Sequence, residues 1–175
     1  MVRFTRFLSA GLAVAGALLL SQASAADPQD WKVIAKVSSV GDKPAIPLSF
    51  NQDPKDVTKA EHGIVLRGPA DLAARTVADP KKAADPAEQQ AAAEWAAKLL
   101  GVEKIEWTKQ MLLAISAGVQ ATPHEVRVVS LKAKDAELVV TWDTVPKSGT
   151  GVSDPKALLL VPRFEGVVRF VRAEK

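Results

Sequence analysis

The side chains best suited to acid-base chemistry or metal binding are two histidines, His62 and His124. Imidazole changes its charge near neutral pH, and its neutral form is a common metal ligand. Neither histidine has a second ligand at a metal-binding spacing, so we interpret both as surface or hydrogen-bonded residues and expect no metal site. If His124 does act, its position after Pro123 makes it a loop contact, or the base of a hydrolase that uses a loop serine or acid.

Two other polar segments invite comparison with known ligand-binding loops. Asn51, Asp53 and Asp56 offer the oxygen atoms that calcium prefers, but the segment lacks the glycine and terminal glutamate of an EF-hand loop. Segment 146–155 is rich in glycine and hydroxyl residues, but it lacks the lysine and serine that complete a phosphate loop. The sequence therefore predicts a solvated turn in the first segment and a flexible loop in the second. No cofactor is expected.

The composition is that of a globular protein held together by its apolar core. Hydrophobic residues make up 47% of the chain and charged residues 25%, so wholesale disorder is not expected. The absence of cysteine excludes disulfides, thiol chemistry and cysteine-type zinc sites. Lysine and arginine are scattered, with no basic run longer than a pair, so the sequence gives no basis for nucleic-acid binding.

The first 25 residues have the three regions of a secretory signal peptide. Arg3 and Arg6 precede an apolar run at 7–20, and an A-x-A motif at 23–25 supplies a cleavage site. The apolar run is short for a transmembrane span. We expect cleavage after Ala25, a periplasmic or secreted protein, and no stable membrane anchor after cleavage. Removing this segment lowers Lys plus Arg from 23 to 21, against 20 Asp plus Glu, so the mature chain is nearly neutral.

The apolar run 111–117 is the segment around which the rest of the chain is predicted to fold. It carries no charge across seven residues. That pattern is typical of a strand in the middle of a sheet, covered on both faces. The run ends at Gly118, and a loop follows.

A β-hairpin is predicted directly after that loop. In 124–131, Val126 and Val128 alternate with Glu125, Arg127 and Val129, which predicts a strand with one buried face. A turn at 132–136 joins it to a second alternating strand at 138–143.

The remaining predicted strands lie before and after this hairpin. Alternating apolar residues in 31–37 predict a single first strand with its apolar side inward. Three further strands are expected at 62–67, 157–161 and 167–171. Segment 42–60 contains several Pro, Asn and Asp residues, and predicts an irregular surface connection.

One helix is predicted, at 86–100. Asp85 is suited to cap it, Pro86 suits its first position, and Gly101 is placed to end it. After Gly68-Pro69 only a brief helical turn is expected. Strands outnumber the helix and follow one another in hairpin order. The expected fold is therefore mainly β with one helix (α+β), an antiparallel sheet or sandwich-like domain with the helix packed on it.

Three segments share their order and residue pattern with a known family. They are Glu94-Trp95 in the helix, the run Glu-Trp-Thr-Lys-Gln-Met-Leu-Leu-Ala-Ile-Ser-Ala-Gly at 106–118, and Val-Gln-Ala-Thr-Pro-His-Glu-Val at 119–126. Together they resemble the C-terminal domain of PrcB-type proteins, the accessory subunits of dentilisin-like protease complexes. The resemblance extends from about residue 63 to residue 171.

The resemblance implies a domain that binds or stabilises a protein partner, with an exported protease as the partner type that the family suggests. The chain is therefore expected to divide into the signal peptide at 1–25, an N-terminal strand and irregular loop at 26–62, and a PrcB C-terminal-like domain at 63–175. This chain differs from the family in two respects. It has Thr122-Pro123-His124-Glu125 where family members typically have Thr-Gly-Gly-Tyr, and it lacks the cysteine of the family's lipoproteins.

The loop after the central strand is the predicted functional surface, because loops held by a rigid sheet often carry binding residues. Its predicted site residues are Gly118, Gln120, Thr122, Pro123 and His124. The sequence thus predicts an exported, non-catalytic module, not an enzyme, that binds or stabilises a protein partner. The alternative is a small-ligand-binding protein or a hydrolase that uses His124, and a third interpretation is a purely structural envelope protein.

Overall fold

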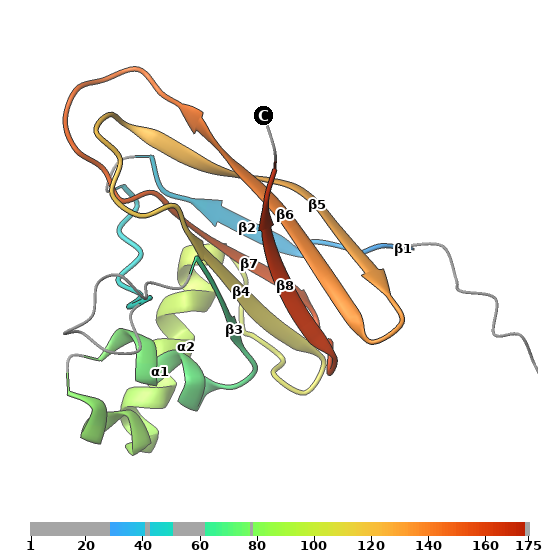
Figure 1. The fold of residues 1–175 in the computed structure, drawn as a ribbon. Helices are drawn as coiled ribbons and strands as arrows, with labels where there is room; N and C mark the ends of the chain where they lie inside the picture. The colour runs from blue at the N-terminus through green and yellow to red at the C-terminus, as the bar shows by residue number, and fades with distance from the viewer. Residues whose placement is uncertain (1–28, 41–42, 51–61, 78, 174–175) are drawn as a thin grey trace, which may run out of the picture.

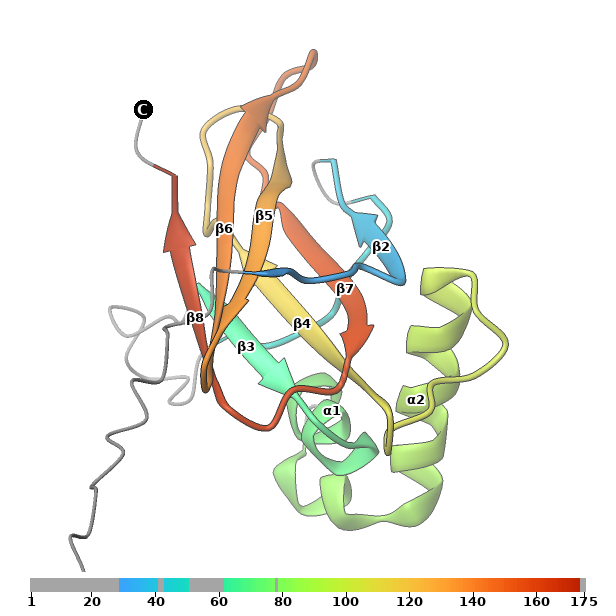
Figure 2. The ribbon, with the colours of Figure 1, turned by 90° about the vertical axis from the view of Figure 1, so that its right-hand side faces the viewer.

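The computed structural model describes residues 29–40, 43–50, 62–77 and 79–173. Two four-stranded sheets pack face to face, and two α-helices cover the outer side of one of them (Figures 1 and 2). The mainly β, α+β prediction is confirmed at this level. The expected signal peptide and the polar segment with Asn51, Asp53 and Asp56 lie outside the described residues.

The first sheet has the strand order β1-β5-β6-β8. Its strands are β1 (Gln29–Asp30), β5 (His124–Lys134), β6 (Glu137–Pro146) and β8 (Val167–Arg172). β5 is antiparallel to both β1 and β6, whereas β8 runs parallel to β6. The expectation of a purely antiparallel sheet is therefore wrong here. The reason is that the chain leaves this sheet after β6, forms a strand of the other sheet, and returns in the original direction.

The second sheet has the order β2-β7-β4-β3, and every neighbouring pair is antiparallel. Its strands are β2 (Ala35–Ser38), β7 (Lys156–Pro162), β4 (Gln110–Ser116) and β3 (Gly63–Leu66). β4 is an inner strand, and its residues 111–116 are all buried. Leu112 faces the helices, while Leu113 faces the first sheet. The predicted strand with two covered faces is confirmed.

The described part of the chain has two α-helices where one was expected. α1 (Pro69–Thr76) occupies the segment predicted to hold a brief turn. Pro69 starts it, and the Asp71 carboxylate accepts the Arg67 backbone N–H at 2.8 Å. Leu72 is fully buried in the helix-side core. Because α1 is short, its tertiary packing supplies stability that its sequence pattern does not reveal.

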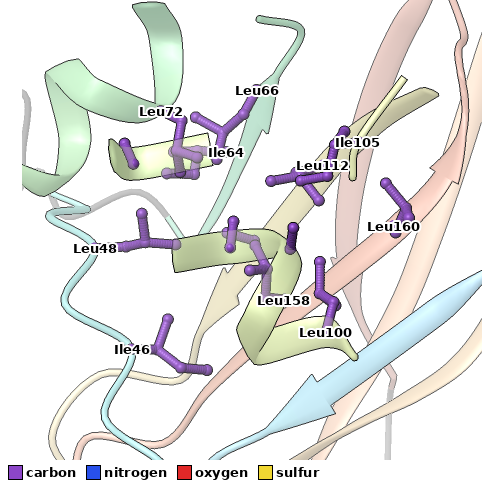
Figure 3. Close-up of a cluster of buried hydrophobic side chains, with 14 of the residues drawn as sticks. Ile46, Leu48, Ile64, Leu66, Leu72, Leu100, Ile105, Leu112, Leu158 and Leu160 are labelled. Carbon is purple, nitrogen blue, oxygen red and sulfur yellow. The ribbon is translucent and has the colours of Figure 1, made fainter. Parts of the chain in front are cut away.

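The predicted helix is α2 (Pro86–Leu100), preceded by a short 3-10 helix, η2 (Pro80–Ala84). The Asp85 side chain accepts the Ala87 N–H at 2.9 Å, and Gly101 ends α2 in the left-handed conformation at φ 69°. Leu100 of this helix belongs to the same buried cluster as Leu112 and Leu158 of the second sheet (Figure 3).

The segment 43–50 is irregular and most of its residues are exposed, as predicted, but three of its apolar side chains are buried. Ile46, Leu48 and Phe50 are only 5%, 3% and 6% exposed and belong to the helix-side core. Alternate residues from 46 to 50 point inward. The segment therefore adds buried apolar side chains to the core although it belongs to neither sheet.

The predicted first strand is divided between the two sheets. The Trp31 N–H donates to the Leu131 carbonyl of β5 at 2.8 Å, whereas the Ile34 N–H donates to the Leu160 carbonyl of β7 at 2.8 Å. Trp31 consequently packs in the core between the sheets, while Val37, further along, packs on the helix side. The alternation of inner and outer residues is confirmed. The prediction that 31–37 forms one strand is wrong, because its two halves bond to different sheets.

The register of β5 shifts at a β-bulge between Val128 and Ser130. Val126 and Val128 face the core, as predicted, and Val129 is 52% exposed. The extra residue restores the inward direction for Leu131, which is 5% exposed.

A stability prediction concerns Gly166, which lies between β7 and β8 and packs against Ala136 in the turn between β5 and β6. A Cβ at this position would overlap the carbonyl oxygen of Ala136, and the next residue, Val167, donates its N–H to that same oxygen at 2.8 Å. We expect Gly166→Ala to lower the free energy of unfolding by about 1–3 kcal/mol, because backbone at a ladder hydrogen bond must move. Urea unfolding followed by circular dichroism measures the change. Gly68→Ala, where a Cβ meets nothing within 4 Å, is the matched control and should cost less than about 1 kcal/mol.

Candidate functional site

Two loops meet at one end of the sandwich, where β4 leads to β5 and β6 leads to β7 (Figure 1). They are joined by a two-residue antiparallel bridge. The Gln120 N–H donates to the Ser153 carbonyl at 2.7 Å, and the Ser153 N–H donates to the Gln120 carbonyl at 2.9 Å. The predicted site loop is therefore braced by a loop that the sequence described only as flexible.

The carbonyl of Thr122 is the centre of the polar contacts in this region. It accepts the Ser153 hydroxyl at 3.0 Å and lies 2.8 Å from His124 Nδ1. The adjoining carbonyl, that of Pro123, accepts the Lys147 N–H at 2.9 Å. Three predicted site residues thus lie in one hydrogen-bonded group, and each contact fixes the path of the loop.

The remaining two predicted site residues shape the start of the loop. Gly118 has φ 68°, in the left-handed region that glycine adopts most easily. The Gln120 side-chain amide turns back and donates to the Ala117 carbonyl at 2.9 Å. The structure therefore explains both residues by loop geometry.

The geometry at His124 differs from that of a base paired with a nucleophile. To bond a carbonyl, Nδ1 must carry the proton, a tautomer assigned from the contact. The nearest hydroxyl, Thr122 Oγ1, is 3.5 Å away, and the ring has no carboxylate partner within the described part of the chain. Ser153 is 2% exposed, and its hydroxyl donates to a carbonyl and not to the imidazole.

A second polar group anchors the two loops to the sheet beneath them. The Ser116 hydroxyl donates to Asp154 Oδ1 at 3.1 Å and accepts the Gly118 N–H at 3.1 Å. The other oxygen of Asp154 lies 3.1 Å from Lys156 Nζ. Ser116 ends β4 and Lys156 begins β7, so Asp154 links both inner strands to the loops.

Sequence reasoning did not identify this group. The polar end of the apolar run at Ser116 was a signal that could have found one member. Nothing local connects it to Asp154, which lies 38 residues further along the chain. His62 lies beside the same group, with its Nδ1 3.3 Å from the Ser116 carbonyl.

No group of three or more potential metal ligands occurs among the described residues. Within the same ranges, no helix is long and apolar enough to cross a membrane. The polar contacts above are hydrogen bonds and one ion pair, and each has a structural role in holding the loops.

Exposed apolar residues flank the bridge. Val119 is 76% exposed and Val152 is 68% exposed, the two highest values among the large hydrophobic residues that the structure describes. Val119 and Ala121 flank Gln120 of the bridge, Val152 precedes its partner Ser153, and all three are exposed, whereas Ser153 is buried. We call these three residues the loop tip.

Comparisons of this chain with known protein families, with curated proteins and with solved structures find no match. The resemblance to PrcB-type proteins stays a prediction, and the function is argued from the geometry of the loops.

The Ser153 contact generates a prediction for loop order. We expect Ser153→Ala to lower the free energy of unfolding by about 1 kcal/mol, because a buried hydroxyl bond to the Thr122 carbonyl is lost. Hydrogen exchange should also become faster at the Gln120 and Ser153 amides, which form the bridge. Ser148→Ala, at an exposed serine of the same loop, should change neither measurement. Equal effects of the two variants would contradict the assigned role.

Proposed function

We propose that this protein is an exported, non-catalytic module that binds or stabilises a protein partner through the loop tip. The observation that carries the proposal is the exposure of Val119 and Val152 on two loops that are braced against each other. The free energy of the system falls when a partner covers apolar side chains that were exposed to water. Single exposed valines are common, but two on one rigid, connected surface favour contact with a partner.

The bracing of the loop tip supports binding because ordering a loop costs entropy. The Gln120–Ser153 bridge and the Ser116–Asp154 contact order both loops before any partner arrives. A partner then binds a surface that is already formed, and less of its interaction energy is spent on ordering.

Two ion pairs lie where the two loops join their strands. Lys147 Nζ lies 2.6 Å from Glu125, and Lys156 Nζ lies 3.1 Å from Asp154. Export is supported by the signal-peptide pattern at 1–25, and the family resemblance favours an exported protease as the partner. The non-catalytic assignment is supported by the carbonyl contacts of His124 and Ser153.

Site-specific photo-crosslinking in the source cells tests the proposal. A photoreactive amino acid at Val119 and, separately, at Val152 should each capture the same partner, identified by mass spectrometry. The same residue at Val167, which is 63% exposed on β8, is the matched control and should not capture it. No capture from either loop position, or equal capture from Val167, would contradict the proposal.

Charge substitution measures the contribution of the loop tip once the partner is known. We expect Val119→Asp combined with Val152→Asp to weaken binding about tenfold or more, because buried apolar contacts at an interface centre contribute most of the affinity. Val167→Asp should leave the affinity unchanged. Unfolding curves of all variants should be similar, since these three valines are exposed.

A further inference from the structure

The strand β8 forms a free edge of the first sheet (Figure 2). Within the described part of the chain, the edge strands of the two sheets are β1, β8, β2 and β3. β8 has 6 residues, whereas each of the other three has 4 or fewer. Natural sheets commonly keep their edge strands short, because an edge offers unpaired backbone groups to any other strand. β8 carries none of the loop-tip residues, so a ligand bound there is independent of the function proposed for the loop tip.

Alternate residues of β8 direct their backbone groups away from the sheet. At the two ends of its ladder, the Val167 and Ala173 N–H groups donate to the carbonyls of residues 136 and 142, at 2.8 and 2.7 Å. Successive peptide groups of a parallel strand point to opposite sides, so the odd-numbered residues bond to β6 and the even-numbered residues do not. The backbone groups of Val168, Phe170 and Arg172 therefore point to the free edge. None of them has a backbone partner within the described part of the chain.

A shallow depression of about 610 Å³ lies between the start of β8 and the edge strand of the second sheet, β3. Val65 of β3 and Val168 of β8 both line it, and no backbone hydrogen bond joins these two strands among the described residues. Arg67 and Glu165 also line it and contribute one charge of each sign, and its other residues are apolar or glycine. A strand added to β8 would therefore place its inward side chains beside an apolar surface.

The outward face of β8 carries an arginine between two exposed valines. Val167 and Val171 are 63% and 43% exposed, and the Arg169 side chain is 67% exposed. Arg169 Nε lies 3.2 Å from Glu137 Oε1, but Glu137 belongs to β6, on the side of β8 away from the free edge. A guanidinium has five donors in a planar fork, so Arg169 can also contact a carboxylate that arrives from the edge side.

The charge of this edge favours an acidic strand over a second copy of the same chain. Arg172 is a second cation on β8, and its side chain is 49% exposed. Two copies paired through β8 would bring both arginines of each copy together, and like charges across a strand pair are destabilising. Side chains alternate between the faces of a strand. A strand that suits this edge therefore alternates apolar residues, which face the depression, with acidic residues, which face Arg169.

We propose that β8 binds an extended peptide of alternating apolar and acidic residues. The peptide adds to the first sheet through the edge-facing backbone groups of Val168, Phe170 and Arg172, and one of its carboxylates contacts Arg169. In strand addition of this kind, backbone hydrogen bonds supply the affinity and alternate side chains supply the specificity.

Two synthetic peptides of equal length test the charge preference, the fluorescently labelled peptide Val-Glu-Val-Glu-Val-Glu-Val and its analogue with lysine in place of glutamate. Fluorescence anisotropy at low salt measures their binding to the protein. We expect the glutamate peptide to bind about tenfold more tightly, and Arg169→Glu to reverse the preference, because the charge beside the added strand changes sign. No binding up to about 1 mM, equal binding of the two peptides, or an unchanged preference in Arg169→Glu overturns the proposal.

Two variants at Arg172 test the backbone contacts. Arg172→Pro and Arg172→Ala remove the same side chain, but only proline also removes the edge-facing N–H, which makes no bond to β6. We expect Arg172→Pro to bind the glutamate peptide about tenfold more weakly than Arg172→Ala, because one backbone hydrogen bond is lost. Circular dichroism should show the same fold in both variants. Equal affinity of the two folded variants overturns the proposal.

Hydrogen exchange on the unaltered protein gives a measurement that does not depend on any variant folding. Bound glutamate peptide should slow exchange at the amides of Val168, Phe170 and Arg172, and unchanged exchange at all three overturns the proposal. Val119→Asp combined with Val152→Asp should bind this peptide as the unaltered protein does. Loss of peptide binding in that variant would place the peptide at the loop tip and overturn its assignment to β8.

Discussion

The burial of β4 and β7 on both faces is the constraint on which the rest of the structure depends. These inner strands separate two cores, one shared with the helices and one shared with the first sheet. Leu158 and Leu160 of β7 face the helices, while Leu159 faces the other sheet. Both faces of these two strands must be covered. The helices cover one face and the first sheet covers the other, and this fixes where those elements lie.

The polar contacts of the loops begin at the ends of these same two strands. Ser116 and Lys156 stand at neighbouring ends of β4 and β7, where the apolar requirement stops, and Asp154 contacts both. The Thr122 carbonyl then gathers the contacts of the outer part of the loop. The buried strands β4 and β7 thus position the polar contacts of Ser116, Asp154 and Lys156. Those contacts in turn hold the loops that carry the exposed loop tip.

Local pattern was sufficient to predict the elements whose burial is regular. The uncharged run of β4, the alternation in β5 and β6, and the caps of α2 all have a period or an end signal within a few residues. The alternation at 31–37 was also correct, but period two does not say which sheet a residue joins, and the chain changes sheets between Trp31 and Ile34. The parallel pairing of β6 with β8 depends on where β7 goes, which is not a local property. For the candidate site, the loop and its five residues were chosen from the sequence, and their role in function stays a prediction. The bracing by Ser153 and the Asp154 link could not be predicted, because each depends on contacts between distant segments.

The strand connectivity of the two sheets determines when during synthesis each sheet can be completed. One sheet contains both the strand at 29–30 and a strand that ends at 172. The other sheet contains both the strand at 35–38 and a strand that ends at 162. Neither can be completed by a partial chain that emerges amino end first. Long-range strand pairing of this kind is slow to nucleate, because chain closure must precede the contacts that reward it. A newly made copy can therefore complete neither sheet until synthesis is nearly finished, whereas the hairpin of β5 and β6, which are adjacent in the chain, can form earlier.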